Sequence, residues 1–99
     1  MGEMTETDPP FVLSPAQKKL ARHAMGLGNG SRRTYRNHFV AGPGHDAFDE
    51  WQAMVRIGAA RCQNGGQLSG GDMVFWLTRA GGEAALEEGE TLKREDFPL

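Results

Sequence analysis

The spacing of apolar residues predicts a first helix that begins after Ser14. Gln17, three positions further on, completes the capping box that is typical of helix starts, and Pro15 occupies the first helical position. Apolar residues then recur at helical intervals, and the glycines from Gly26 onward are expected to end the helix. The predicted inward stripe consists of Ala16, Leu20, Ala24 and Leu27.

A second helix is predicted from Asp46 onward. Asp46 and Asp49 give it an acidic first turn, which suits the positive end of the helix dipole. Gly58 is a candidate end for this helix, with residues 59–63 then extended. The predicted apolar stripe, which makes this the main core helix, consists of Phe48, Trp51, Met54, Val55, Gly58, Ala59 and Cys62.

Strand signals lie on both sides of the second helix. Residues 33–40 alternate weakly in polarity, which predicts a short strand or an extended segment. Residues 73–78 carry the strongest strand signal, because they are rich in β-branched and aromatic side chains. Paired glycines around residues 67–69 predict the tip of a long hairpin. Thr78 then caps a short predicted helix that reaches Leu86.

These elements predict one small domain of the α+β class. In chain order they are a helix, an extended segment, a helix, a two-stranded wing and a short helix. The domain is predicted over residues 14–88, after a flexible N-terminal arm at 1–13 and before a loose C-terminal tail at 89–99. A chain of 99 residues is too short for a barrel enzyme, which typically needs about 250.

Residues 51–86, about a third of the chain, combine several features in a characteristic order. A helix ending M-V-R-I-G leads to a short A-A-R-C strand, a glycine-rich wing and the sequence V-F-W-L-T-R-A-G-G-E-A-A-L. This stretch resembles the C-terminal half of a winged-helix domain, which implies a winged-helix-like fold and binding to duplex DNA. The segment Y-R-N-H-F-V-A-G-P-G-H is similar to small uncharacterised phage or prophage proteins, which implies a phage-encoded protein.

The chain departs from the winged-helix pattern in front of the wing. That family usually has three helices there, and the third enters the major groove with polar and basic residues near its start. Only two helices are predicted here, and the second opens with Asp46, Asp49 and Glu50. Because these carboxylates would repel phosphates, we expect DNA to meet another surface.

The charge distribution predicts where that surface lies. The net charge is −2, but residues 1–13 carry −3, residues 14–45 carry +6 and the remainder carries −5. The predicted nucleic-acid contacts are Lys18, Lys19, Arg22, Arg32, Arg33, Tyr35, Arg36 and Asn37. The alternatives are a solvated linker at residues 28–33 and packing of Tyr35 against the core.

The sequence predicts no catalysis, metal or cofactor. Cys62 is the single cysteine and is expected to be a small buried residue, without a disulfide. Zinc-binding spacing is absent from the candidate ligands, which are His23, His38, His45, Cys62, Asp46 and Asp72. There is neither an apolar run of about 20 residues nor a signal peptide. We therefore expect a cytoplasmic, non-enzymatic protein without a membrane or small-molecule partner.

Two functions follow as predictions. The favoured one is a small nucleic-acid-binding or regulatory protein that contacts phosphates through its basic face. The alternative is a protein–protein interaction module, such as a phage structural, adaptor or host-inhibiting protein, or a homo-oligomer. It rests on Phe75 and Trp76, which are adjacent on a strand and point to opposite faces, so that one is expected to be exposed. The face with Met73, Phe75 and Leu77 is the predicted core face, which leaves Trp76 as the exposed aromatic residue. The predicted partner-binding residues are Trp76, Gln67 and Leu68.

Overall fold

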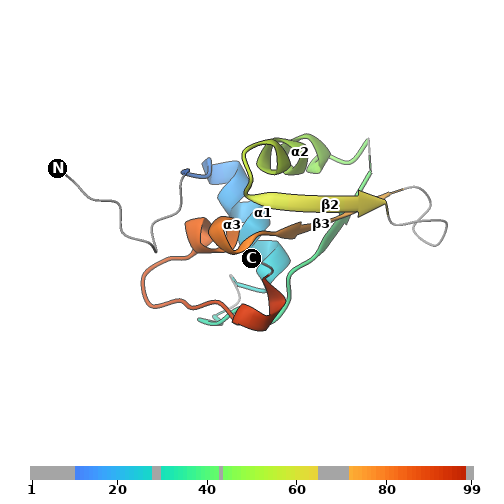
Figure 1. The fold of residues 1–99 in the computed structure, drawn as a ribbon. Helices are drawn as coiled ribbons and strands as arrows, with labels where there is room; N and C mark the ends of the chain where they lie inside the picture. The colour runs from blue at the N-terminus through green and yellow to red at the C-terminus, as the bar shows by residue number, and fades with distance from the viewer. Residues whose placement is uncertain (1–10, 28–29, 43, 65–71, 98–99) are drawn as a thin grey trace.

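The computed structural model describes residues 11–27, 30–42, 44–64 and 72–97 (Figure 1). This part of the chain forms three α-helices, a three-stranded antiparallel sheet and a 3-10 helix, which confirms the α+β class. The elements are α1 (Pro15–Met25), β1 (Phe39–Ala41), α2 (Phe48–Arg56), β2 (Ala60–Asn64), β3 (Met73–Leu77), α3 (Arg79–Ala85) and η2 (Arg94–Asp96). The predicted hairpin tip, with Gln67 and Leu68, lies outside the described residues, as do residues 1–10.

The sheet has one strand more than the predicted two-stranded wing. Its strands lie in the order β1-β3-β2, with Phe39 opposite Phe75 and Ala60 opposite Leu77. The additional strand comes from the end of the segment predicted as extended, because Phe39 packs against the core while its neighbour Val40 points to solvent. The winged-helix arrangement itself stays a prediction.

The start and the end of α1 form as predicted. Ser14 Oγ accepts a hydrogen bond from the Gln17 amide at 3.1 Å, and Gln17 Oε1 accepts one from the Ser14 amide at 3.0 Å. Gly26 ends the helix with φ at +83°, where the ring of Tyr35 lies too close for any side chain.

The buried side of α1 agrees only in part with the predicted stripe, because Ala24 and Leu27 are buried and Leu20 packs against the core. Ala16 is exposed, whereas Ala21 and Met25 are fully buried together with Ala24. Alanine spacing alone did not distinguish the two sides, because alanines occur on both of them.

The core lies between α2 and the sheet. Trp51 and Met54 of α2 are fully buried, and the Trp51 ring stacks on Phe75 with ring centroids 5.5 Å apart. Phe75 and Leu77 are both buried, so the predicted core face of β3 is confirmed. Trp76 points to the opposite face of the sheet and is partly exposed.

Two glycines allow α3 to approach the rest of the domain closely. Thr78 caps the helix by accepting a hydrogen bond from the Gly81 amide at 3.1 Å, as predicted. A Cβ atom at Gly81 would lie 1.8 Å from the Ala59 carbonyl oxygen, and one at Gly82 would lie 2.8 Å from the Phe97 ring. The glycines lower the helix propensity of α3, but its packing requires them.

The prediction of a loose tail is wrong for residues 89–97. Phe97 is only 2% exposed and belongs to the core. The Thr34 amide donates to the Thr91 carbonyl at 3.1 Å, and the Lys93 amide donates to Thr34 Oγ1 at 2.8 Å. This segment therefore packs on the domain because it has apolar side chains to bury and an extended neighbour that supplies hydrogen bonds.

The end of the predicted N-terminal arm also docks, because Leu13 is buried and Phe11 packs against the core. None of the helices in the described part of the chain is long and apolar enough to cross a bilayer.

Candidate nucleic-acid interface

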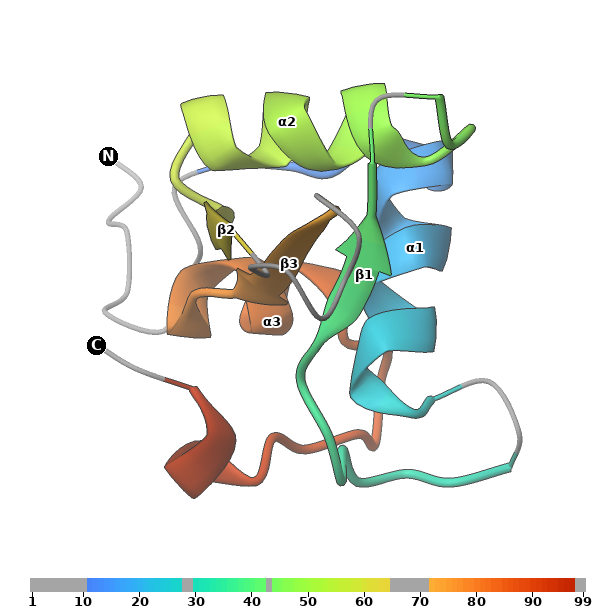
Figure 2. The ribbon, with the colours of Figure 1, turned by 90° about the vertical axis from the view of Figure 1, so that its right-hand side faces the viewer.

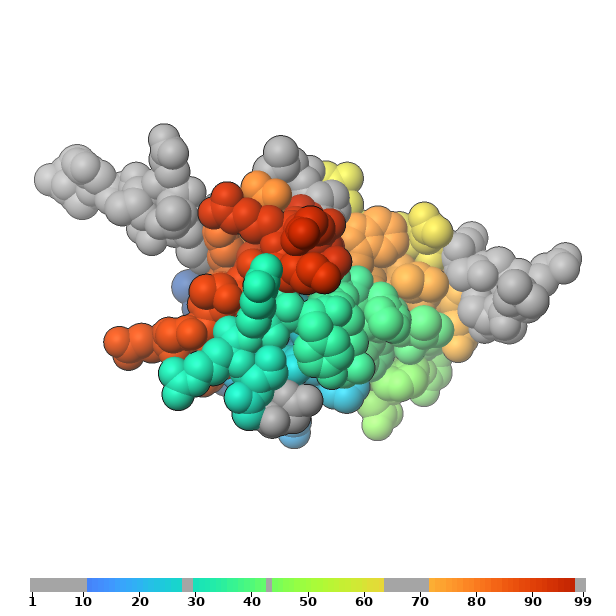
Figure 3. Space-filling view, turned by 90° about the horizontal axis from the view of Figure 1, so that it is seen from below, coloured from blue at the N-terminus to red at the C-terminus, as the bar shows by residue number. Residues whose placement is uncertain are grey.

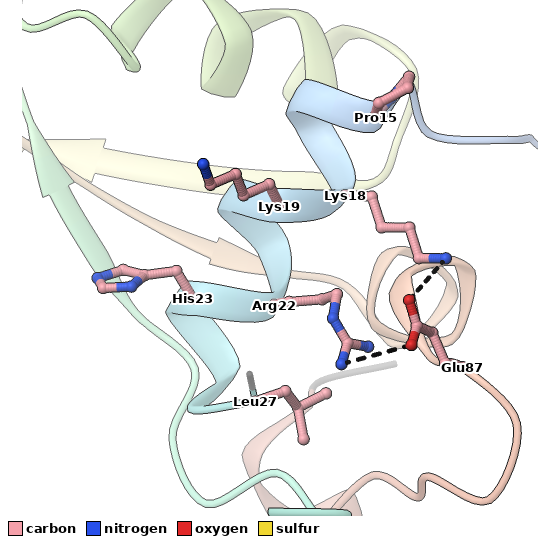
Figure 4. A pocket seen from close by; sticks show the side chains of 7 residues that line it. All are labelled: Pro15, Lys18, Lys19, Arg22, His23, Leu27 and Glu87. Atoms are coloured by element: carbon pink, nitrogen blue, oxygen red, sulfur yellow. Dashed lines mark ion pairs between the residues drawn. The ribbon is translucent and has the colours of Figure 1, made fainter. Parts of the chain in front are cut away.

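The basic side of α1 faces the acidic residues that follow α3 (Figure 4). Lys18 Nζ lies 3.4 Å from the Glu87 carboxylate, and Arg22 Nη2 lies 3.9 Å from it. Figure 4 shows Lys18 and Arg22 pointing toward Glu87 along one edge of an open hollow of about 460 Å³. These two predicted phosphate contacts therefore have an intramolecular anion beside them.

Arg22 is held more firmly by a second carboxylate. Its guanidinium forms a two-pronged ion pair with Glu90, with Nη2 donating to Oε2 at 2.7 Å, and Nη1 also donates to the Ala85 carbonyl at 3.0 Å. The two side chains are only 16% and 10% exposed. Arg22 was predicted to contact nucleic acid, but its ion pair and hydrogen bond instead join α1 to the segment that follows α3. The acidic run after α3 packs against Arg22 through Glu87 and Glu90.

The ion pair shifts the pKa of both partners. The hydrogen bond from Arg22 holds the pKa of Glu90 at about 2, against an ordinary value of 4.5, although burial opposes the shift. The same hydrogen bond raises the pKa of Arg22. Because the folded-state pKa of Glu90 is lowered, its contribution to stability is complete above about pH 4.5 and disappears as the pH falls toward 2.

We therefore expect the acid sensitivity of the fold to depend on Glu90. In wild type, the urea midpoint should decrease as the pH is lowered from about 5 to about 2.5. Glu90→Gln should be less stable than wild type at neutral pH, and its urea midpoint should decrease less on acidification. Urea titrations at several pH values measure this. Glu88→Gln, which alters an exposed neighbour, is the control. An unchanged acid profile in Glu90→Gln would contradict the assigned role.

Lys19 and His23 lie on the other flank of α1. In Figure 4 both side chains point away from the group formed by Lys18, Arg22 and Glu87. Both are exposed, and Lys19 forms no ion pair within the described residues. The basic side chains around this hollow therefore point in two directions, and they do not surround one common binding position.

Arg36 and Tyr35 close the end of α1. Arg36 Nη2 donates to the His23 carbonyl at 2.8 Å, which places a cation at the negative end of the helix dipole. The guanidinium carbon also lies 5.4 Å from the centre of the Tyr35 ring. Tyr35 remains 53% exposed, so the ring is not a core residue.

Asn37 has a structural position that the sequence did not reveal. Its Oδ1 accepts from the Leu77 amide at 2.8 Å, while Nδ2 donates to the carbonyls of Leu77 and Asp96 at 3.0 and 2.9 Å. The amide group therefore joins β3 to the C-terminal segment. With its hydrogen-bonding capacity used in this way, Asn37 is not available to read a base.

Arg32 and Arg33 lie on a surface that we call the two-segment face, formed by residues 30–37 and 90–96. The two segments run side by side and form an isolated parallel bridge between Arg33 and Thr91. Figure 3 shows them adjacent on one side of the molecule. Arg32 and Arg33 are exposed, and neither guanidinium has a hydrogen-bond or ion-pair partner among the described residues.

The second segment adds Lys93 and Arg94 to this face, and the sequence analysis missed both. The apolar pair Leu92 and Phe97 was the available signal, since it could have indicated that the segment docks. Acidic residues border one edge, where Arg32 lines an open hollow of about 380 Å³ with Glu87, Glu88 and Glu90.

The start of α2 carries negative charge, as expected from its sequence. Asp46 and Asp49 are exposed, and no cation pairs with them in the part of the chain that the structure describes. This end of α2 is therefore unsuited to phosphate contact.

Among the described residues, no three histidine, cysteine or acidic side chains are grouped as a metal site would require. Cys62 is a free, half-buried thiol. Comparison of the chain with protein-family models, with curated proteins and with solved structures finds no match.

Proposed function

We propose that this protein is a non-enzymatic nucleic-acid-binding protein that contacts phosphates through the two-segment face. The observation that carries the proposal is the contrast between two pairs of cations. Lys18 and Arg22 have carboxylates beside them, whereas Arg32 and Arg33 are exposed without an acidic partner in the described residues. Unpaired guanidiniums on a surface are suited to two-pronged phosphate contacts.

The neighbouring charges support this location. Lys93 and Arg94 add two cations from the adjacent segment, which also carries Glu95 and Asp96, while Glu90 is already paired with Arg22. A net charge of −2 repels a polyanion at long range, so binding depends on local contacts. We therefore expect affinities in the range of non-specific binding, roughly 10⁻⁴ to 10⁻⁶ M, with a strong dependence on salt.

The test is a titration of a fluorescent 20-base-pair duplex by anisotropy at about 50 and 200 mM salt. If three or four phosphates are contacted, affinity should fall roughly 40- to 150-fold between these concentrations. The double variant Arg32→Gln/Arg33→Gln should bind more weakly at low salt, and the negative slope of log K against log salt should become shallower by about 2.

The matched control is Lys19→Gln/Arg56→Gln, which removes two exposed cations elsewhere and changes the net charge equally. This control should retain the wild-type slope. Equal losses in the two double variants would show that total charge, and not the two-segment face, determines binding. Absence of wild-type binding at low salt would refute the proposed function.

A further inference from the structure

The face of the sheet that points away from α2 carries a partly exposed apolar and aromatic strip. Val40 is 45% exposed, and Val74 and Trp76 of the central strand are partly exposed on the same face. Figures 1 and 2 show α2 on one side of the sheet and the C-terminal segment on the other. In Figure 3 the side chains of β3 reach the surface between β1 and β2.

The strand register places a cationic side chain beside Trp76. Arg61 of β2 lies directly opposite Trp76 and is exposed. On the other side, the pairing of β1 with β3 begins at Phe39 and Phe75, and the exposed His38 precedes it with its amide donating to the Ala24 carbonyl of α1. Val74 is flanked by Val40 and Gln63, so the strip is narrow and has polar edges.

This face is continuous with the two-segment face. Asn37, at the end of the first segment, hydrogen-bonds both to Leu77, the neighbour of Trp76, and to Asp96 in the second segment. Figure 3 shows both surfaces on one side of the molecule, with the C-terminal segment beside β3. A polymer whose backbone follows the arginines can therefore reach Trp76 without turning around the domain.

We propose that the sheet face stacks a base of single-stranded nucleic acid on Trp76, with Arg61 contacting an adjoining phosphate. This inference rests on the proposed function and specifies that the bound nucleic acid is single-stranded. Duplex bases are stacked internally, and a broad sheet face does not enter a groove, whereas unpaired bases can lie flat on an aromatic ring. The exposed Arg61 beside Trp76 supplies a charge that is complementary to a polyanion.

The experiment compares two 12-nucleotide ligands with the same number of phosphates. One is oligothymidylate, and the other is a dodecamer of tetrahydrofuran abasic sites, which lacks bases. Wild type should bind oligothymidylate about 5- to 100-fold more tightly than the abasic dodecamer. Trp76→Ala should bind both ligands with the affinity that wild type has for the abasic dodecamer. Trp76→Phe should restore most of the preference because it keeps an aromatic ring. Ile57→Ala, which truncates an exposed apolar residue after α2, is the control.

The outcomes separate this inference from the proposed function. Equal binding of the two ligands by wild type would refute base stacking and leave phosphate binding intact. Absence of binding to both single-stranded ligands with duplex binding retained would refute the inference alone, and absence of binding to the duplex as well would refute both proposals. If Trp76→Ala instead changed the oligomeric state in sizing chromatography and left the base preference unchanged, the strip would be a protein interface and the inference would be wrong.

Discussion

Replacing Trp51 with alanine is expected to destabilise the protein by about 3 to 5 kcal/mol. The Trp51 side chain is fully buried, and the centroid of its ring lies 5.4 Å from the ring centroid of Phe39 and 5.5 Å from that of Phe75. Its removal would leave a cavity where the two sheet aromatics meet α2. A small domain has only about 5 to 15 kcal/mol of stability, so a large unfolded fraction is expected. Urea titration followed by near-ultraviolet circular dichroism measures the change.

Two variants make the interpretation specific. Within the described residues Trp51 Nε1 is buried without a hydrogen-bond partner, so Trp51→Phe keeps an aromatic ring and removes an unsatisfied group. It should be much less damaging than alanine. Trp76→Ala should cost about 1 to 2 kcal/mol, because its ring is only partly buried. Equal losses at Trp51 and Trp76 would contradict the assignment of the two sheet faces.

Phe97→Ala is also expected to cost about 3 to 5 kcal/mol, although Phe97 is close to the C-terminus. Its ring is 2% exposed and rests on Gly82, so it joins the C-terminal segment to α3. Urea titration measures the loss, and Glu95→Ala, an exposed change in the same segment, should stay within about 0.5 kcal/mol. A small effect at Phe97 would mean that the tail is loose, as the sequence alone had predicted.

Features that depend on nearby residues could be predicted from the sequence. The capping box of Ser14 and Gln17 and the cap formed by Thr78 involve partners three residues apart. The buried face of β3 followed from strict alternation along the strand, because successive side chains point to opposite sides. In each case the interacting groups are fixed by local backbone geometry.

The ion pair and the hydrogen bonds that define the candidate site join distant parts of the chain, and local sequence patterns do not encode them. Arg22 meets Glu90 across 68 positions, and Asn37 meets Leu77 and Asp96 across 40 and 59. The sequence showed a basic segment and an acidic segment, but not which charges would neutralise each other. As a result, the predicted set of contacts included Arg22 and Asn37 and omitted the cations of the C-terminal segment.

The glycines of α3 also determine how that helix unfolds locally. Its seven residues, two of them glycines, are too short and too flexible to persist as a helix alone. The helix therefore exists only while it is docked between the Ala59 backbone and the Phe97 ring. Consequently α3 and residues 90–97 form one cooperative unit, whose amide protons exchange with solvent through a shared opening event rather than by independent fraying.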